Sequence, residues 1–200
     1  RFKDRGVSYI TLCHILTNDI CDSARGDAEW GGLSPFGKEV VAEMNRLGIL
    51  VDVSHAAEST FYDALEISTQ PIIASHSSAR ALCNHPRNLT DDQLKALAEK
   101  QGLVQVCLYK GFINEDAEKA SLTDAIRHIN HIADLIGINH VGIGSDFDGD
   151  GELIGCRASN ELINITLRLL KDGYKENDIA KIWGGNLLRV MSRVQSAYNG

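Results

Sequence analysis

Two short apolar runs that each end in Ser-His place the strongest constraint on how this chain folds. The first run covers residues 49–55 and the second covers residues 71–76, with one amphipathic stretch of about a single helix between them. A strand, a helix and a second strand in this order predict a parallel βαβ unit. Because parallel strands end at the same edge of a sheet, His55 and His76 are expected at the edge where α/β folds carry out their chemistry.

The rest of the chain repeats this alternation of apolar strands and amphipathic helices. Further strands are expected over residues 7–14, 103–109 and 140–146. Ser34-Pro35 and a capping box from Thr90 to Gln93 mark two helix starts, and the last helix is expected to break at Gly184-Gly185. Near-continuous apolar strands indicate a parallel sheet covered on both faces. Five such units form either a small doubly wound sheet or five units of a (β/α)8 barrel, and the polar strand ends favour the barrel.

Composition narrows the class of protein. The 200 residues suffice for one domain with a sizeable core, and the net charge of −7 argues against nucleic acid and anionic membrane surfaces as partners. No apolar run reaches the roughly 18 residues of a membrane span. Five widely spaced cysteines without a CxxC pair predict free thiols, which favours a reducing compartment. The chain begins at Arg1 rather than Met, so we expect a preceding segment, and any targeting signal would lie there.

Four side chains with metal-binding or acid–base chemistry come at predicted strand ends. They are His14, His55, His76 and Asp146. Imidazole suits zinc, and an Asp carboxylate can bind a metal or accept a proton. A single histidine at a strand end is equally well explained by a structural role, but four such residues at one edge indicate a metal or catalytic site.

The other polar residues are interpreted differently. Arg87 follows the second Ser-His strand, where a guanidinium can bind a carboxylate with paired hydrogen bonds, although the residues alone favour a solvated loop arginine. His85 lies close to Arg87 in the same loop, and it either borders the pocket in which Arg87 would bind a carboxylate or lies on the surface. His128 and His131 lie opposite the apolar stripe of a predicted helix and are expected to be solvent-exposed. Cys107, inside an apolar strand, is expected in the core.

With these residues in view, the chain resembles the membrane dipeptidase (renal dipeptidase) family of metallopeptidases. The matching stretches run in order over nearly the whole chain, at residues 9–14, 32–37, 45–55, 75–79, 87–88, 141–149 and 185–190. The resemblance implies that residues 1–200 are the C-terminal part of one (β/α)8 barrel domain, whose first three units precede Arg1. It also implies zinc-dependent hydrolysis of dipeptides by a water or hydroxide that bridges two zinc ions.

The same resemblance implies a role for each candidate residue. His55 and His76 would bind one zinc ion, while Asp146 would lie at the second and pass a proton to the leaving amine. His14 would contact the substrate carbonyl, and Arg87 would bind the C-terminal carboxylate of the dipeptide. The family's His-x-Asp pair and bridging Glu have no match here, so these ligands are expected from the N-terminal part of the barrel.

Two other functions stay open at this point. A different amidohydrolase-like barrel, such as a deaminase or a phosphotriesterase-like enzyme, would also place histidines and an Asp at these strand ends. Alternatively, the polypeptide is an inactive piece or one subunit of a split barrel that binds its other half. The expected partners are therefore dipeptide substrates, the N-terminal barrel half and, as a homodimer, a second copy of the chain.

Overall fold

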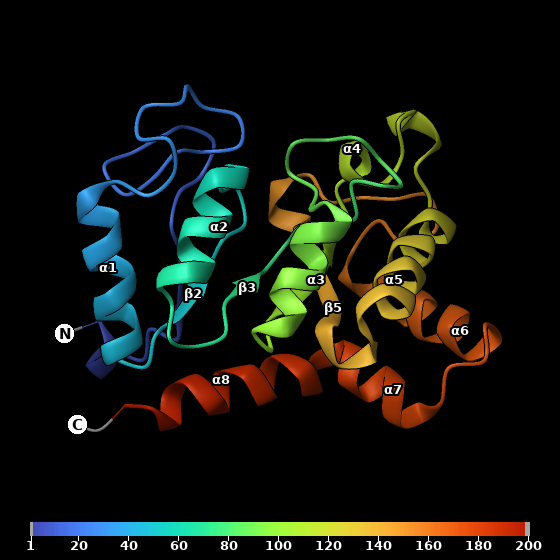
Figure 1. Ribbon diagram of the computed structural model, residues 1–200. Coiled ribbons are helices and arrows are strands. Elements are labelled where there is room, and N and C mark those ends of the chain that lie inside the picture. Colours follow the sequence, from blue (N-terminus) through green and yellow to red (C-terminus); the bar gives the residue numbers. More distant parts are fainter. Residues whose placement is uncertain (1, 199–200) are drawn as a thin grey trace. The chain divides into compact units, whose positions relative to one another are not determined.

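A computed structural model describes residues 2–198 and shows strands and helices in alternation along the chain (Figure 1). The strands are β1 (Tyr9–Thr11), β2 (Leu50–Asp52), β3 (Ile73–Ala74), β4 (Leu103–Cys107) and β5 (Val141–Ser145). The helices are α1 (Pro35–Arg46), α2 (Glu58–Ile67), α3 (Asp91–Glu99), α4 (Lys110–Ile113), α5 (Leu122–Ile136), α6 (Ile163–Lys171), α7 (Glu176–Ala180) and α8 (Asn186–Ser196). β1 pairs with β2, β2 with β3, and β4 with β5, and each of these pairs is parallel, which confirms the predicted parallel α/β class.

The residues group into two compact units. Among the described residues, unit 1 consists of residues 2–74, 96–103 and 187–198. Unit 2 consists of Ser75–Lys95 and Val104–Asn186. The strands β1, β2 and β3 therefore belong to unit 1, whereas β5 and nearly all of β4 belong to unit 2.

In unit 1, the helix signals read from the sequence are present in the structure. The Ser34 hydroxyl accepts a hydrogen bond from the Gly37 N–H at 2.9 Å, and Pro35 occupies the first helical position, as predicted. The core of this unit lies where α8 covers the sheet. Its buried members are Leu50, Ile73, Leu103, Val190 and Val194. Apolar contact with the strands therefore holds α8 in place.

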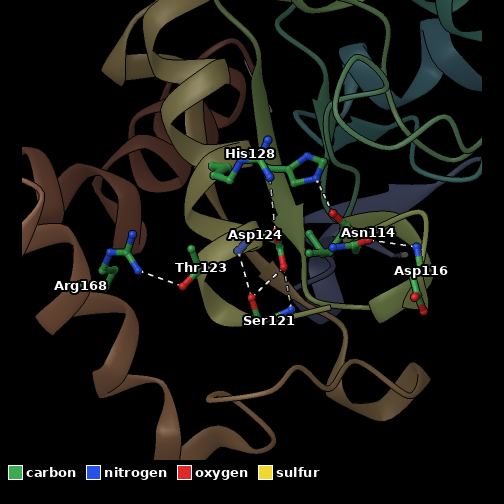
Figure 2. A network of polar contacts seen from close by, with 9 residues as sticks. Asn114, Asp116, Ser121, Thr123, Asp124, His128 and Arg168 are labelled. Carbon is green, nitrogen blue, oxygen red and sulfur yellow. Dashed lines mark hydrogen bonds and ion pairs between the residues drawn. The ribbon is translucent and has the colours of Figure 1, made fainter. Parts of the chain in front are cut away.

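In unit 2, α5 begins with a reciprocal cap between Ser121 and Asp124 (Figure 2). The Ser121 N–H donates to the Asp124 carboxylate at 3.1 Å, and the Asp124 N–H donates to the Ser121 hydroxyl at 3.4 Å. The predicted box at Thr90 and Gln93 is also formed, with bonds of 2.9 and 3.2 Å in the two directions.

Two details of the sequence-based expectations need correction. The first strand covers only Tyr9–Thr11 rather than residues 7–14, because the following residues enter a loop. The prediction that His128 is solvent-exposed is also wrong. This side chain is 1% exposed, since the backbone of Ala79 and of Ile113 covers it and bonds both ring nitrogens. His131 lies at the surface of the same helix and bonds Asp91.

Three further expectations concern the cysteines and the helices. All five cysteines are free and buried. Among residues 2–198, the helices are each too short or too polar to cross a membrane. The predicted break in the last helix is confirmed, since residues 181–185 form a wider π-type turn between α7 and α8.

Candidate functional site

His14 and His55 meet in unit 1 because they follow paired strands at equal distances. Thr11 at the end of β1 is in register with Asp52 at the end of β2, and each histidine comes three residues later. Their ring centroids are 4.4 Å apart. His55 has a φ of +70°, a left-handed conformation that is uncommon for a residue other than glycine. The structure thus brings these two candidate side chains into contact.

A short loop segment, residues 22–24, fixes the backbone at both histidines. The Ser23 hydroxyl lies 3.1 Å from the carbonyl oxygen of His14, and the Ala24 N–H donates to the carbonyl oxygen of His55 at 2.7 Å. The neighbouring Asp22 carboxylate accepts backbone N–H groups of Glu29 at 2.8 Å and of Gly32 at 3.0 Å. Burial alone would raise the pKa of Asp22, but these backbone bonds outweigh it and lower the pKa below its ordinary value.

Asp52 joins the two strands just below the histidines. One carboxylate oxygen accepts the Thr11 hydroxyl at 2.7 Å, and the other accepts the Ser54 N–H at 3.0 Å. The side chain is fully buried, so these bonds replace the water that it loses on folding. Asp52 thus fixes the turn that leads into His55.

In unit 2, the Ser75-His76 segment lies directly against β5. A Cβ added at Gly144 would collide with the Ser75 carbonyl oxygen and come within 3.0 Å of the His76 Cα, so this strand position requires glycine. The Ser75 hydroxyl and the His76 Nδ1 are 2.8 Å apart. Because Gly144 precedes Asp146 by two residues, His76 lies beside the strand that carries the candidate Asp.

Asp146 occupies a sharp turn at the end of β5. Its φ is +74°, and that of Ser145 is +34°. The Gly149 and Gly151 N–H groups donate to its carbonyl oxygen at 3.0 and 2.8 Å, which closes the turn. The Cys107 sulfur lies 3.6 Å from one Asp146 carboxylate oxygen. Burial raises the pKa of Cys107 to about 12, so its thiol stays protonated and can donate to that oxygen. Cys107 is a core residue, as predicted.

Arg87 is buried rather than solvated, with only 3% of its surface exposed. One guanidinium nitrogen donates to the His76 carbonyl oxygen at 3.2 Å, and another lies 3.4 Å from the Ser77 hydroxyl. The guanidinium carbon is 5.2 Å from the centre of the Phe112 ring, a cation–π arrangement. The alternative of a solvated loop arginine is therefore wrong, because three neighbours surround its charged end.

His85 lies beside the same ring. Its imidazole centroid is 4.5 Å from that of Phe112, and its Nδ1 accepts the Arg87 backbone N–H at 3.1 Å. The structure places His85, partly exposed, next to Arg87, and its place at the border of a substrate pocket stays a prediction. Sequence reasoning missed Phe112, because it lies on the short helix α4 after β4, with no local feature that marks it.

The structure therefore brings the candidate residues together in two sets. Unit 1 joins His14 and His55, and unit 2 places His76 beside Arg87 and beside the strand that leads to Asp146. Within residues 2–198, no group of three or more His, Cys, Asp or Glu side chains is placed to hold a metal ion. The predicted pairing of His55 with His76 stays a prediction.

Comparison with known proteins identifies the family. The sequence profile of the membrane dipeptidases (Peptidase family M19) matches residues 1–200. The chain belongs to the membrane dipeptidase family. It is 39% identical over 196 residues to the dipeptidase tcpJ of Claviceps purpurea, an alignment that covers 97% of this chain and 46% of that protein.

Two solved structures of similar proteins show the fold. The probable dipeptidase PvdM from Pseudomonas aeruginosa is 28% identical, with a TM-score of 0.95 over 98% of this chain and 64% of that one. A metallo peptidase from Rhodobacter sphaeroides, liganded with a phosphinate mimic of the dipeptide L-Ala-D-Ala, is 30% identical, with a TM-score of 0.90 over 96% of this chain and 57% of that one. The fold is thus that of the dipeptidase barrels, and the doubly wound alternative is wrong.

The alignments show how much of each related dipeptidase this chain covers. It spans about half the length of the curated dipeptidases that it matches. Membership in a family of metallopeptidases indicates a metal cofactor. The donor types near the strand ends, imidazole nitrogen and carboxylate oxygen, fit a zinc or similar divalent ion.

Proposed function

We propose that the protein containing this chain is a zinc-dependent dipeptidase, which hydrolyses the peptide bond of a dipeptide. The observation that carries the proposal is the match of all 200 residues to the membrane dipeptidase family. The relative that was solved with a dipeptide mimic supports the substrate class. The buried Arg87 guanidinium, bonded to the backbone of the candidate ligand His76, supports recognition of a carboxylate close to a metal.

The same proposal assigns the metal ligands. His55 and His76 would hold one zinc ion and Asp146 would hold a second. In support, the two histidines follow β2 and β3, which pair in parallel with Asp52 opposite Ile73. Bound zinc lowers the pKa of water and polarises a carbonyl group. The remaining ligands would come from a segment outside these residues, since residues 2–198 contain no complete group of donors.

The residues of this chain would then act on the substrate in a defined order. Arg87 binds the free carboxylate with paired hydrogen bonds and sets the distance from it to the scissile bond. As water adds to the carbonyl carbon, Asp146 takes one water proton, and His14 stabilises the negative charge that develops on the carbonyl oxygen. Asp146 then returns the proton to the amide nitrogen as the carbon–nitrogen bond breaks, which releases two amino acids.

Metal analysis and a hydrolysis assay on the full-length protein test this function. We expect two zinc ions per chain and cleavage of dipeptides in strong preference to dipeptide amides or longer peptides, because only a dipeptide places its carboxylate at Arg87. A full-length protein that binds no divalent metal and cleaves no dipeptide would overturn the proposal. If Arg87→Ala left the KM for dipeptides unchanged, a different amidohydrolase-like reaction would be favoured.

A further inference from the structure

The Arg87 guanidinium lies between two walls that come from separate parts of unit 2. One wall is Ser77, whose hydroxyl lies 3.4 Å from a guanidinium nitrogen. The other wall is the Phe112 ring, at 5.2 Å from the guanidinium carbon. We call this pair of walls the Arg87 slot. Because Arg87 is nearly fully buried, the orientation of its guanidinium depends on where the two walls lie.

A single side chain, that of Asn88, is bonded to both walls. Its Oδ1 accepts the N–H of Ser78, the residue next to Ser77, at 3.0 Å. Its Nδ2 donates to the carbonyl oxygen of Phe112 at 2.8 Å and to that of Cys83 at 2.9 Å. The side chain is fully buried, so it makes these three bonds where water cannot replace them.

The chemistry at this position is specific to an asparagine amide. An Asp of the same shape has no donor for the Phe112 and Cys83 carbonyl oxygens, and Ala keeps none of the three bonds. Losing the bond to Phe112 frees the backbone that carries the ring under the guanidinium. Losing the bond to Ser78 frees the segment that carries the Ser77 hydroxyl. Either change lets Arg87 leave its present orientation.

We propose that Asn88 is a positioning residue, which holds the Arg87 slot so that the guanidinium meets the C-terminal carboxylate of the substrate. The proposal rests on the proposed dipeptidase function. Asn88 acts through Arg87 and does not itself contact substrate. Its effect therefore appears in the binding of substrates that carry the carboxylate, whereas a merely structural residue affects every substrate alike.

Steady-state kinetics of the full-length, zinc-loaded protein separate these two roles. For Asn88→Ala and Asn88→Asp we expect KM for a dipeptide to rise by about tenfold, as expected for the loss of one charge-assisted interaction, with kcat nearly unchanged. KM for the corresponding dipeptide amide should not rise, since Arg87 has no carboxylate to bind there. If a variant is partly unfolded, kcat falls but KM stays valid, so poor folding does not imitate the expected result.

Asn45 offers a matched control in unit 1. It is also a buried asparagine that joins segments, accepting the Thr69 N–H at 2.7 Å and donating to the Ser68 hydroxyl at 3.1 Å. We expect Asn45→Ala to lower stability and to leave KM for the dipeptide unchanged. Adding Asn88→Ala to Arg87→Ala should raise KM no further, because both act through one interaction.

A second measurement does not depend on hydrolysis. Arg87 in the wild-type full-length protein should react slowly with phenylglyoxal because it is buried, and Asn88→Ala should accelerate labelling of its peptide several-fold, while Asn45→Ala should not. Labelling tests the positioning role even if the wild type cleaves no dipeptide. The absence of hydrolysis would refute only the proposed function. Wild-type labelling rates in the Asn88 variants, or equal changes in KM for dipeptide and amide, would overturn the inference.

Discussion

Mild acid is expected to destabilise unit 2 through one buried imidazole. His128 accepts the Ala79 N–H at Nδ1, 3.0 Å away. Its Nε2–H donates to the Ile113 carbonyl oxygen at 3.1 Å (Figure 2). Both bonds require the neutral ring, because a protonated Nδ1 cannot accept. Burial accordingly lowers the pKa of His128 from 6.5 to about 4.

The size and sign of the effect follow from this pKa. Between about pH 6.5 and pH 4 the unfolded chain binds a proton that the folded chain excludes, so stability falls as the pH falls through this window. A shift of about 2.5 units at about 1.4 kcal/mol per unit corresponds to roughly 3 kcal/mol. This stabilisation is fully present at neutral pH, and most of it is lost by about pH 4.5.

Urea unfolding of the full-length protein at a series of pH values measures this loss. His128→Gln keeps a polar side chain but cannot titrate, so we expect it to be less stable than wild type at pH 7. We also expect the difference in the free energy of unfolding to shrink by about 2 to 3 kcal/mol at pH 4.5. Metal loss in acid affects both proteins and cancels in the difference.

His131→Gln is the matched control. It removes one imidazole from the same helix, at a side chain that is 26% exposed and bonded to Asp91. We expect it to follow the wild-type dependence on pH much more closely than His128→Gln does. A His128→Gln protein that loses as much stability as wild type between pH 7 and pH 4.5 would refute the reasoning.

Three further changes test other parts of the structure. Arg87→Ala should raise KM for dipeptides by about a hundredfold in steady-state assays, since a charge-assisted contact with the carboxylate is lost. Gly144→Ala should lower stability by about 3 kcal/mol in thermal melting, because its Cβ would collide with the Ser75 backbone. Asp22→Asn should cost about 1 to 2 kcal/mol in urea unfolding at neutral pH. Because the folded pKa of Asp22 is lowered, the wild-type advantage should fade as the pH drops below about 4.

Local signals predicted much of the fold. The Ser34-Pro35 start of α1 and the Thr90 box at α3 depend on neighbouring residues alone, and both are present in the structure. The burial of His128 depends instead on Ala79, which is far away in the sequence, and on Ile113. Helical periodicity describes one helix by itself, so it missed a polar residue that other segments cover.

The candidate site likewise combines features that the local sequence predicts with features that depend on distant segments. The sequence placed His14 and His55 at strand ends, but their contact follows from the register of β1 and β2, which only the structure shows. The sequence also pointed to Arg87, but not to its burial, because the Phe112 ring comes from a helix that follows a later strand. Asn88 had only its place next to Arg87 to mark it. Residue types at strand ends are readable from sequence, whereas the neighbours that orient them come from the folded chain.

The left-handed backbone at His55, Ser145 and Asp146 lowers the stability of the chain at turns that carry two of the candidate zinc ligands. A side chain in that conformation costs roughly 1 kcal/mol or more, which glycine avoids. Selection for thermostability alone would therefore enrich glycine at these three positions and, on the proposed function, would remove a zinc ligand from each unit. A library of this protein selected only for folding is thus expected to drift away from activity, starting at the turns where its strands end.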